Sequence, residues 1–566
     1  MSKKKIFIYQ LLPRLFGNTN QSNVGNGSLE DNGCGKFNDI NDDILQKLVK
    51  QGYTHVWYIG VIAHASMTDY SKYGIYSGNP EIIKGKAGSP YAIRDYYDVD
   101  PDLAVDVNNR MQEFESLVER THKAGLKVII DNVPNHLARE YKSISKPKGI
   151  RDFGETDDST QDFSINNNFY YLPEEKLEIQ VPDERVGEFT YEEYPAKVTG
   201  NDCFNSKPTV YNWYETVKLN YGVDYSRGYR TSFYPIPDTW NKMRDVFMYW
   251  ADKGVDGFRC DMAEMVPLEF WEWVIPQIKA KHVNIIFIAE IYNTSRYRSF
   301  LGQHVFDYLY DKVGLYDILR DVSCGYRPSS DITFALNSVG DIQGRLLNFL
   351  ENHDEQRLAS DYFLKDGMKG KAAMILTCCI NTNPVMVYFG QELGEKGMDE
   401  EGFSGSDGRT TIFDYWSVDT VCRWNNKGKW NNELLTEEEV TLKDFYSRLL
   451  SICNTESAIY KGLFYDLMSS NYDNESFDST KIFAFLRGYE NNVLLVICNF
   501  DQEEKECKVN IPEHAFSFFG IDKFSKMTMK PLLCKEGKKR IVVNECEDVV
   551  VKIGGNSGEI YKLTFK

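Results

Sequence analysis

The sequence lacks several features that would point to common functions. Its 12 cysteines include no C-x-x-C pair, so neither a zinc knuckle nor a thioredoxin-type redox site is indicated. No apolar run approaches the ~18 residues of a membrane span. The glycine-rich stretch at residues 25–35 has no phosphate-loop pattern, which argues against nucleotide binding. We find no internal repeat and no low-complexity tract.

Positive charge is also scarce. The chain has 65 Lys and Arg against 83 Asp and Glu, a formal net charge of −18. Such a chain repels phosphate backbones and anionic membranes, so we expect neither nucleic acid nor a membrane as a partner. A neutral substrate fits better. Aromatic residues make up 14% of the chain, which serves either a large core or the stacking of rings on flat apolar faces such as those of sugars.

The N-terminus is basic and then apolar, which superficially resembles a signal peptide. Gln10, Pro13 and Arg14 interrupt the apolar run, and no small-x-small cleavage site follows. We therefore interpret residues 5–12 as a strand. Together with the absence of cysteine motifs, this favours a cytoplasmic protein with reduced thiols.

Short β-rich runs alternate with amphipathic helical patterns along most of the chain. Such alternation predicts a parallel sheet. About eight strands are expected, the number in a (β/α)8 TIM barrel, with a doubly wound open sheet as the structural alternative. The expected strands are residues 5–12, 55–62, 126–133, 254–261, 284–290, 305–308, 346–350 and 384–389.

Two regions depart from this alternation. Residues 135–237 are rich in Asn, Asp, Glu, Tyr and Gly, and a structureless loop of that length is implausible, so we predict a subdomain inserted after the third strand. From about residue 455 the strands alternate in a pattern typical of a C-terminal antiparallel β-sandwich. The predicted domains are the barrel (1–136 and 238–454), the inserted subdomain (137–237) and the sandwich (455–566).

Polar side chains stand where four of the expected strands end. The segments are DNVPNH at 131–136, GFRCD at 257–261, FIAE at 287–290 and FLENHD at 349–354. Parallel barrel strands all point one way, so these residues should converge on the face that carries barrel active sites. Asp261, Glu290 and Asp354 would meet there from three strands. Arg259 lies on the same side of its strand as Asp261 and can keep that carboxylate ionised.

These four segments resemble, in order and spacing, the four signature regions of the α-amylase family of retaining α-glucan hydrolases and transferases. The resemblance spans most of residues 1–450. It implies that Asp261 is the nucleophile and Glu290 the general acid/base. It implies that Asp354 is the third carboxylate, which binds sugar hydroxyls and stabilises the distorted transition state.

The same resemblance implies further contacts to the sugar. Arg259, His136 and His353 match residues around the sugar that precedes the cleaved bond, and Tyr91 resembles the tyrosine that stacks on it. Arg357 follows Asp354 by three residues. It either reaches the sugar or forms an ion pair with Asp354 or Glu355.

The expected family calcium site is altered here. The segment TVKLN at 216–220 resembles the family's fifth region, but Lys218 stands where calcium-dependent members carry an aspartate. After the nucleophile, Met265 replaces a histidine whose carbonyl often completes the calcium shell. Because hard cations need several oxygen ligands, we expect no metal and no other cofactor, although calcium stays possible. The KLN form is similar to the neopullulanase and cyclomaltodextrinase branch.

The sequence therefore predicts a retaining hydrolase of α-1,4 bonds in maltooligosaccharides or starch-derived glucans. A transglycosylase using the same site is the first alternative, because only the acceptor that resolves the glycosyl-enzyme differs. A non-catalytic amylase-like binding protein is the second, and the presence of all three carboxylates argues against it. Oligomeric state and chain-length preference stay open.

Overall fold

Eight parallel strands form the centre of the molecule and close into a barrel. The computed structural model describes residues 5–179, 191–209, 211–403, 405–521, 524–534, 541–544 and 549–566. The strands pair in the order β15-β14-β13-β12-β5-β2-β1-β16, and a bridge between Asn348 and Val385 joins the two ends. They are β1 (Phe7–Leu11), β2 (His55–Tyr58), β5 (Lys127–Asn132), β12 (Gly257–Cys260), β13 (Ile286–Ala289), β14 (Tyr308–Tyr310), β15 (Leu346–Leu347) and β16 (Val385–Tyr388). The predicted (β/α)8 barrel is confirmed.

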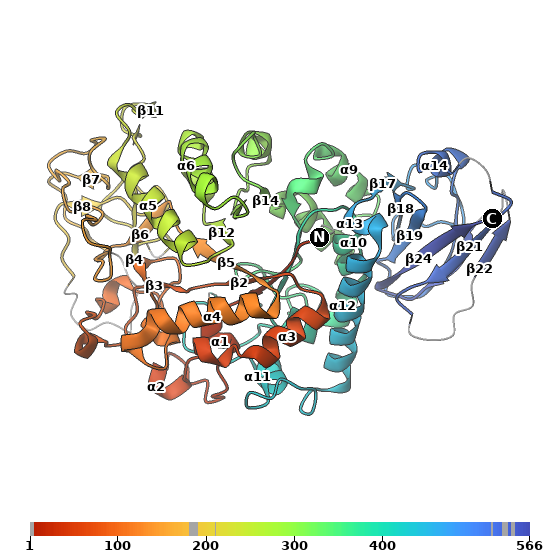
Figure 1. Cartoon of the computed structure of the whole chain (residues 1–566), viewed down its shortest axis with the longest axis horizontal. Coiled ribbons are helices and arrows are strands. Elements are labelled where there is room, and N and C mark those ends of the chain that lie inside the picture. The colour runs from red at the N-terminus through yellow and green to blue at the C-terminus, as the bar shows by residue number, and fades with distance from the viewer. Residues whose placement is uncertain are drawn as a thin grey trace.

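Helices surround this barrel (Figure 1). The longer ones are α3 (Asp42–Gln51), α4 (Arg110–Ala124), α5 (Asp238–Asp252), α6 (Leu268–Lys281), α8 (Asp317–Ser323), α9 (Asp331–Ser338), α10 (Lys371–Cys379), α11 (Asp419–Asn425) and α12 (Glu437–Thr455). Local signals set their ends. The side chain of Asn41 caps α3 by accepting a hydrogen bond from Ile44 N, and Gly52 ends the helix at φ 107°.

The sixth strand begins later in the sequence than expected. The apolar run at 305–308 predicts the sixth strand, but β14 begins only at Tyr308. Val305 and Phe306 are buried in irregular backbone, where the Phe306 ring lies 4.7 Å from that of Trp271. Phe306 is apolar because it packs against α6, not because it belongs to the strand. Apolar character alone does not distinguish these two cases.

The inserted region leaves the barrel after β5 and has little regular structure. Its strands are β6 (His136–Ala138), β7 (Tyr171–Leu172), β8 (Ala196–Lys197), β9 (Thr216–Lys218), β10 (Val223–Asp224) and β11 (Arg230–Thr231). β6 pairs antiparallel with β9. This pairing brings residues near 215 against the start of the insertion. A second excursion, β3 (Ile62–His64) paired with β4 (Ile93–Val99), follows β2.

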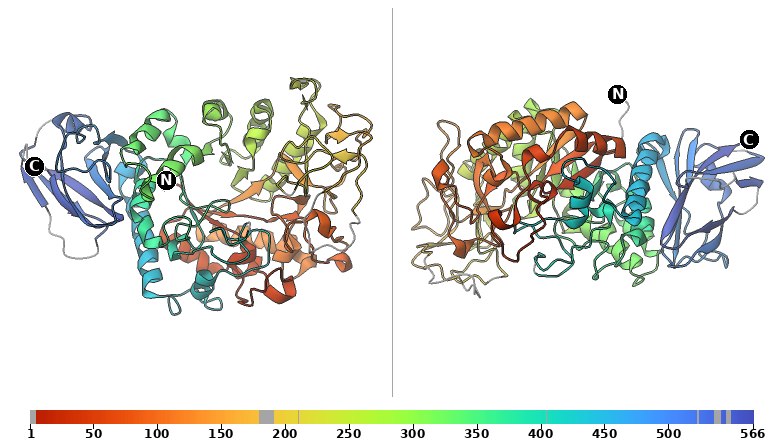
Figure 2. Two further views of the ribbon diagram at one scale, coloured as in Figure 1. Left: turned by 180° about the vertical axis from the view of Figure 1, so that it is seen from behind. Right: turned by 90° about the horizontal axis from the view of Figure 1, so that it is seen from below.

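The C-terminal region forms two antiparallel sheets at the opposite end of the molecule from the insertion (Figures 1 and 2). The larger has the order β17-β18-β19-β24-β21-β22, and β20 pairs with β23. The strands are β17 (Leu463–Asp466), β18 (Ile482–Tyr489), β19 (Asn492–Asn499), β20 (Lys505–Val509), β21 (Lys526–Pro531), β22 (Ile541–Asn544), β23 (Val549–Ile553) and β24 (Ser557–Phe565). α10 of the barrel packs against β19 and β24. Across the described ranges, no helix is both long and apolar enough to cross a membrane.

Candidate active site

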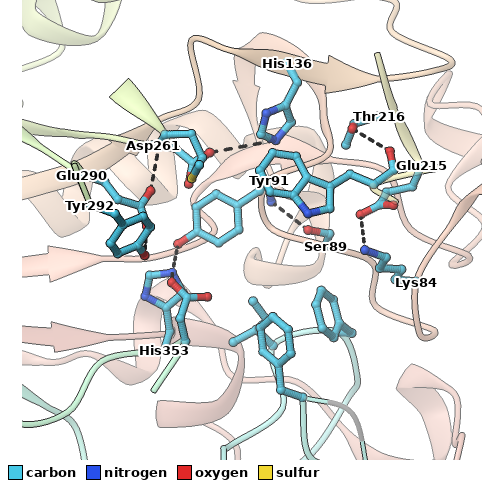
Figure 3. A pocket seen from close by; sticks show the side chains of 16 residues that line it. Lys84, Ser89, Tyr91, His136, Glu215, Thr216, Asp261, Glu290, Tyr292 and His353 are labelled. Carbon is cyan, nitrogen blue, oxygen red and sulfur yellow. Dashed lines mark hydrogen bonds and ion pairs between the residues drawn. The ribbon is translucent and has the colours of Figure 1, made fainter. Parts of the chain in front are cut away.

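One cavity of about 280 Å³ opens at the carboxyl ends of the barrel strands. Asp261 follows β12 directly, Glu290 follows β13, and Asp354 lies in the loop after β15. All three line the cavity, and Figure 3 labels Asp261 and Glu290. The complete lining is Lys84, Ser89, Tyr91, His136, Trp213, Glu215, Thr216, Asp261, Met262, Glu290, Tyr292, His353, Asp354, Phe403, Ile412 and Phe413.

A fully buried arginine connects two of these carboxylates. Arg259 Nη1 lies 2.6 Å from Asp261 Oδ1, and Arg259 Nη2 lies 2.8 Å from Glu290 Oε2. The same Nη1 is 3.4 Å from Asp131 Oδ1 in β5. Arg259 and Asp261 are on one side of their strand, as the two-residue period predicts. One guanidinium therefore serves three acidic side chains.

Burial raises the pKa of Asp261 well above its usual range. The positive charge of Arg259 opposes this increase, whereas the negative charge of Glu290 adds to it. Asp261 therefore holds its proton to a higher pH than an exposed aspartate does.

Glu290 accepts hydrogen bonds from two groups that the sequence analysis did not identify. The Tyr292 hydroxyl donates to Oε1 over 2.7 Å, and the Met262 backbone N–H donates to Oε2 over 2.8 Å. Tyr292 follows Glu290 by two residues, so continued strand-like alternation is the signal that could have revealed it. These bonds fix the orientation of the Glu290 carboxyl group in the cavity.

Tyr91, His353 and Asp354 form a connected wall. His353 Nε2 lies 3.0 Å from Asp354 Oδ2 and 2.5 Å from the Tyr91 hydroxyl, and the rings of Tyr91 and His353 stack with centroids 5.3 Å apart. Gln10 of β1 holds the other ring nitrogen at 3.1 Å. Burial acts to raise the pKa of Asp354, but the charge and hydrogen bond of His353, together with the charges of Arg259 and Arg409, outweigh burial and lower that pKa. Asp354 therefore stays ionised near neutral pH.

His136 stands on the other side of Asp261. Its Nε2 is 3.9 Å from Asp261 Oδ2, and its ring lies 5.1 Å from the indole of Trp213. Burial lowers the pKa of His136 to about 3, and the charges of Lys218 and Lys84 act in the same direction. A neutral imidazole is suited to exchange hydrogen bonds with hydroxyl groups rather than to pair with Asp261 as a cation.

The expectation that Arg357 reaches the sugar is wrong. Its side chain is fully buried and does not line the cavity. Nη1 lies 2.9 Å from Glu351 Oε2 and donates to the Phe389 carbonyl, while Nε donates to Thr410. The ion pair expected as the alternative does exist, but with Glu351 rather than Asp354 or Glu355. Because the loop turns after β15, the side chain points into the protein.

Lys218, which stands where the resemblance implies an aspartate that binds calcium, is buried beside two side-chain oxygens. Its Nζ lies 2.9 Å from Asn135 Oδ1 and 2.6 Å from Asp202 Oδ1, and the residue is 1% exposed. An ammonium group here already satisfies both oxygens and would repel a divalent ion. The residues present therefore do not fit calcium. Within the described ranges, no group of three or more His, Cys, Asp or Glu side chains is arranged to hold a metal.

The far end of the cavity is built by residues that the sequence analysis did not select. Trp213 and Glu215 come from the insertion, and Lys84 comes from the segment between β3 and β4. They are far from the signature segments in the sequence, and the pairing of β6 with β9 helps to bring the insertion over the barrel. No local pattern marks these residues as part of the site.

Comparison with known proteins identifies what this arrangement resembles. The family model described as "Alpha amylase, catalytic domain" matches residues 10–285. "Alpha-amylase 2" of Dictyoglomus thermophilum is 22% identical over 435 residues, and the match covers 76% of this chain and 61% of that relative. The noncanonic maltogenic alpha-amylase AmyB of Thermotoga neapolitana superposes with a TM-score of 0.61 at 20% identity, covering 100% of both chains. The alpha-amylase of Geobacillus thermoleovorans, solved with acarbose, superposes with a TM-score of 0.62 at 16% identity, covering 99% of this chain and 98% of that one.

Proposed function

We propose that this chain, whose residues 10–285 match the alpha-amylase catalytic domain, is a glycoside hydrolase that cleaves α-1,4 bonds of maltooligosaccharides with retention at the anomeric carbon. The observation that supports this most is the contact of one guanidinium, that of Arg259, with both Asp261 and Glu290. Retaining enzymes need their two carboxyl groups only ~5–5.5 Å apart, whereas inverting ones leave room for a water between them. A shared arginine favours the closer spacing.

The reaction proceeds in two displacements. In the first, an oxygen of ionised Asp261 attacks the anomeric carbon, the bond from that carbon to the glycosidic oxygen breaks, and Glu290 gives its proton to the departing oxygen. In the second, the Glu290 carboxylate takes a proton from water. The water oxygen then attacks the same carbon and releases Asp261. Each inversion of configuration cancels the other, so the product keeps that of the substrate.

The remaining cavity residues bind and distort the sugar. Asp354 is ionised and partly exposed, with 30% of its side chain accessible, so it is able to accept hydrogen bonds from two ring hydroxyls. Tyr91 presents an aromatic face for the sugar ring. His136 and His353 exchange hydrogen bonds with further hydroxyls. These contacts become stronger as positive charge develops on the sugar, which lowers the barrier.

We also infer that catalysis does not require calcium. This inference is supported by the ammonium of Lys218, which lies between Asn135 and Asp202. The cytoplasmic location stays a prediction of the sequence.

A time course with maltoheptaose tests the proposed reaction. Products shorter than the substrate, initially in the α-anomeric form by NMR, are the expected result. Products longer than the substrate would instead identify a transferase that uses the same glycosyl-enzyme. Initial β-anomers would contradict retention, and no turnover of maltoheptaose would contradict the proposed substrate.

A further inference from the structure

An ion pair crosses the cavity at the end opposite Glu290. Lys84 Nζ lies 2.9 Å from Glu215 Oε1, with side-chain exposures of 25% and 5%. In Figure 3, Glu290 and Tyr292 occupy one end of the cavity, Tyr91 the middle, and Lys84 and Glu215 the other end. Lys84 belongs to the segment between β3 and β4, and Glu215 directly precedes β9 of the insertion. The pair therefore ties the insertion to the barrel.

The chemistry of the reaction assigns a direction to the cavity. A general acid must lie beside the glycosidic oxygen that leaves, so the leaving part of the glucan extends past Glu290. The sugar that forms the glycosyl-enzyme sits over Asp261. The part of the chain that precedes this sugar, toward the non-reducing end, must run toward Lys84 and Glu215. The ion pair thus stands in the path of a longer glucan.

A second cavity lies on the other side of this pair. Lys84, Phe403 and Phe413 line both the catalytic cavity and a neighbouring cavity of about 460 Å³. The second cavity also borders Glu401 and Asp414. The Lys84 ammonium lies 5.7 Å from the centre of the Tyr214 ring and 5.9 Å from that of Phe413. These side chains separate the two cavities, which would otherwise form one continuous cleft.

Glu215 also carries an unused acceptor. Its Oε2 is buried and takes no hydrogen bond from any side chain or backbone group in the described part of the chain. Leaving a buried carboxylate oxygen without a donor is costly, so a donor is expected when the site is filled. Because Glu215 lines the cavity, a small rotation of its carboxyl group would bring this oxygen to a hydroxyl of a terminal sugar.

We propose that the Lys84–Glu215 pair closes the non-reducing side of the cleft, so that the enzyme recognises chain ends and releases short products of uniform length. This inference rests on the proposed α-glucan hydrolysis. It adds that Glu215 binds a hydroxyl of the terminal sugar and that Lys84 separates the two cavities. A glucan whose non-reducing end carries a bulky group should then not enter.

The test compares two substrates. One is maltoheptaose, and the other is the same oligosaccharide with its terminal 4- and 6-hydroxyls blocked by a benzylidene group. We expect the wild-type enzyme to cleave the blocked sugar at least 10-fold more slowly and to release one short product from the free sugar. Lys84→Met removes the charge and keeps most of the stem. In this variant the cleavage rates of the two substrates should differ by less than threefold. The free sugar should then give products of several lengths.

Further variants and outcomes make the test decisive. Glu215→Gln should raise KM for the free sugar more than it changes kcat. Lys207→Met is the control, because it breaks an exposed ion pair with Glu178 in the same insertion. It should change neither the ratio of the cleavage rates of the two substrates nor the KM for the free sugar. Equal wild-type rates on both substrates, with internal cleavage, would overturn the inference while leaving the hydrolase assignment intact. If neither substrate gives products, the proposed function itself is overturned. The wild-type comparison decides the question even if a variant does not fold.

Discussion

Arg259 and Asp261 are 2.6 Å apart, yet burial still raises the pKa of Asp261 well above its usual range. The arginine also contacts Glu290 and Asp131, so its charge is divided among three carboxyl groups. The spacing of the two residues in the sequence predicts that Arg259 keeps Asp261 ionised. The structure shows that Arg259 opposes the effect of burial on the pKa of Asp261 but does not cancel it. The ionised form of Asp261 therefore requires a higher pH than that of an ordinary aspartate.

The first prediction is an acid limit set by Asp261. Attack requires the ionised carboxylate, and a raised pKa keeps the proton bound to a higher pH. We expect kcat/KM on maltoheptaose to rise with pH through a midpoint clearly above the ~3.9 of an ordinary aspartate. A pH profile measured over the range in which the fold is intact checks this. Full activity down to pH 4 would contradict the prediction. It would show that the charge of Arg259 cancels the effect of burial on the pKa of Asp261.

The second prediction concerns Asp261→Asn. Turnover should fall by at least ~10³-fold, because the nucleophile is lost. The folded-state pKa exceeds the unfolded one, so the stability provided by the neutral form is complete below ~pH 4 and is lost as pH rises through the folded pKa. The permanently neutral variant should therefore melt a few degrees higher than wild type at pH 8 and equally at pH 4. Unchanged turnover in this variant would disprove the assignment of Asp261.

The third prediction separates Glu290 from Asp261. Glu290→Gln should lower kcat on maltoheptaose by ~10²–10⁴-fold, because the leaving oxygen receives no proton. An aryl maltoside with an acidic leaving group needs little protonation, so its first step should be nearly restored in Glu290→Gln. The same substrate should give no recovery in Asp261→Asn. Equal recovery in both variants would mean that the two roles are wrongly assigned.

The fourth prediction is independence from calcium. Millimolar chelator should change neither the rate on maltoheptaose nor the melting temperature, because the Lys218 ammonium satisfies Asn135 and Asp202. Lys218→Met should lower the melting temperature, since it leaves these oxygens without their donor. A loss of activity in chelator that added calcium restores would refute the prediction.

The sequence predicts those parts of the site that depend on strand order. Asp261 and Glu290 follow their strands directly, so eight parallel strands suffice to bring them together. Arg357 differs because its direction depends on how the loop after β15 turns, and its partner Glu351 lies six residues earlier. Lys84 and Glu215 are 131 positions apart and meet only through the folding of the insertion. Periodicity carries no information about such long-range contacts.

The fifth prediction follows from the buried pair of Arg357 and Glu351. Arg357→Met should destabilise the fold by ~3–5 kcal/mol, because it leaves an acidic group in the interior without its cation. Burial raises the pKa of Glu351 to about 7 even with Arg357 present, so the loss should be largest above that pH and smaller in acid, where Glu351 is neutral. Adding Glu351→Gln should recover part of the stability, as measured by urea unfolding at pH 8. KM for maltoheptaose should stay unchanged at temperatures where the variant is folded, since Arg357 does not line the cavity. A raised KM with unaltered stability would instead return Arg357 to the substrate-binding residues.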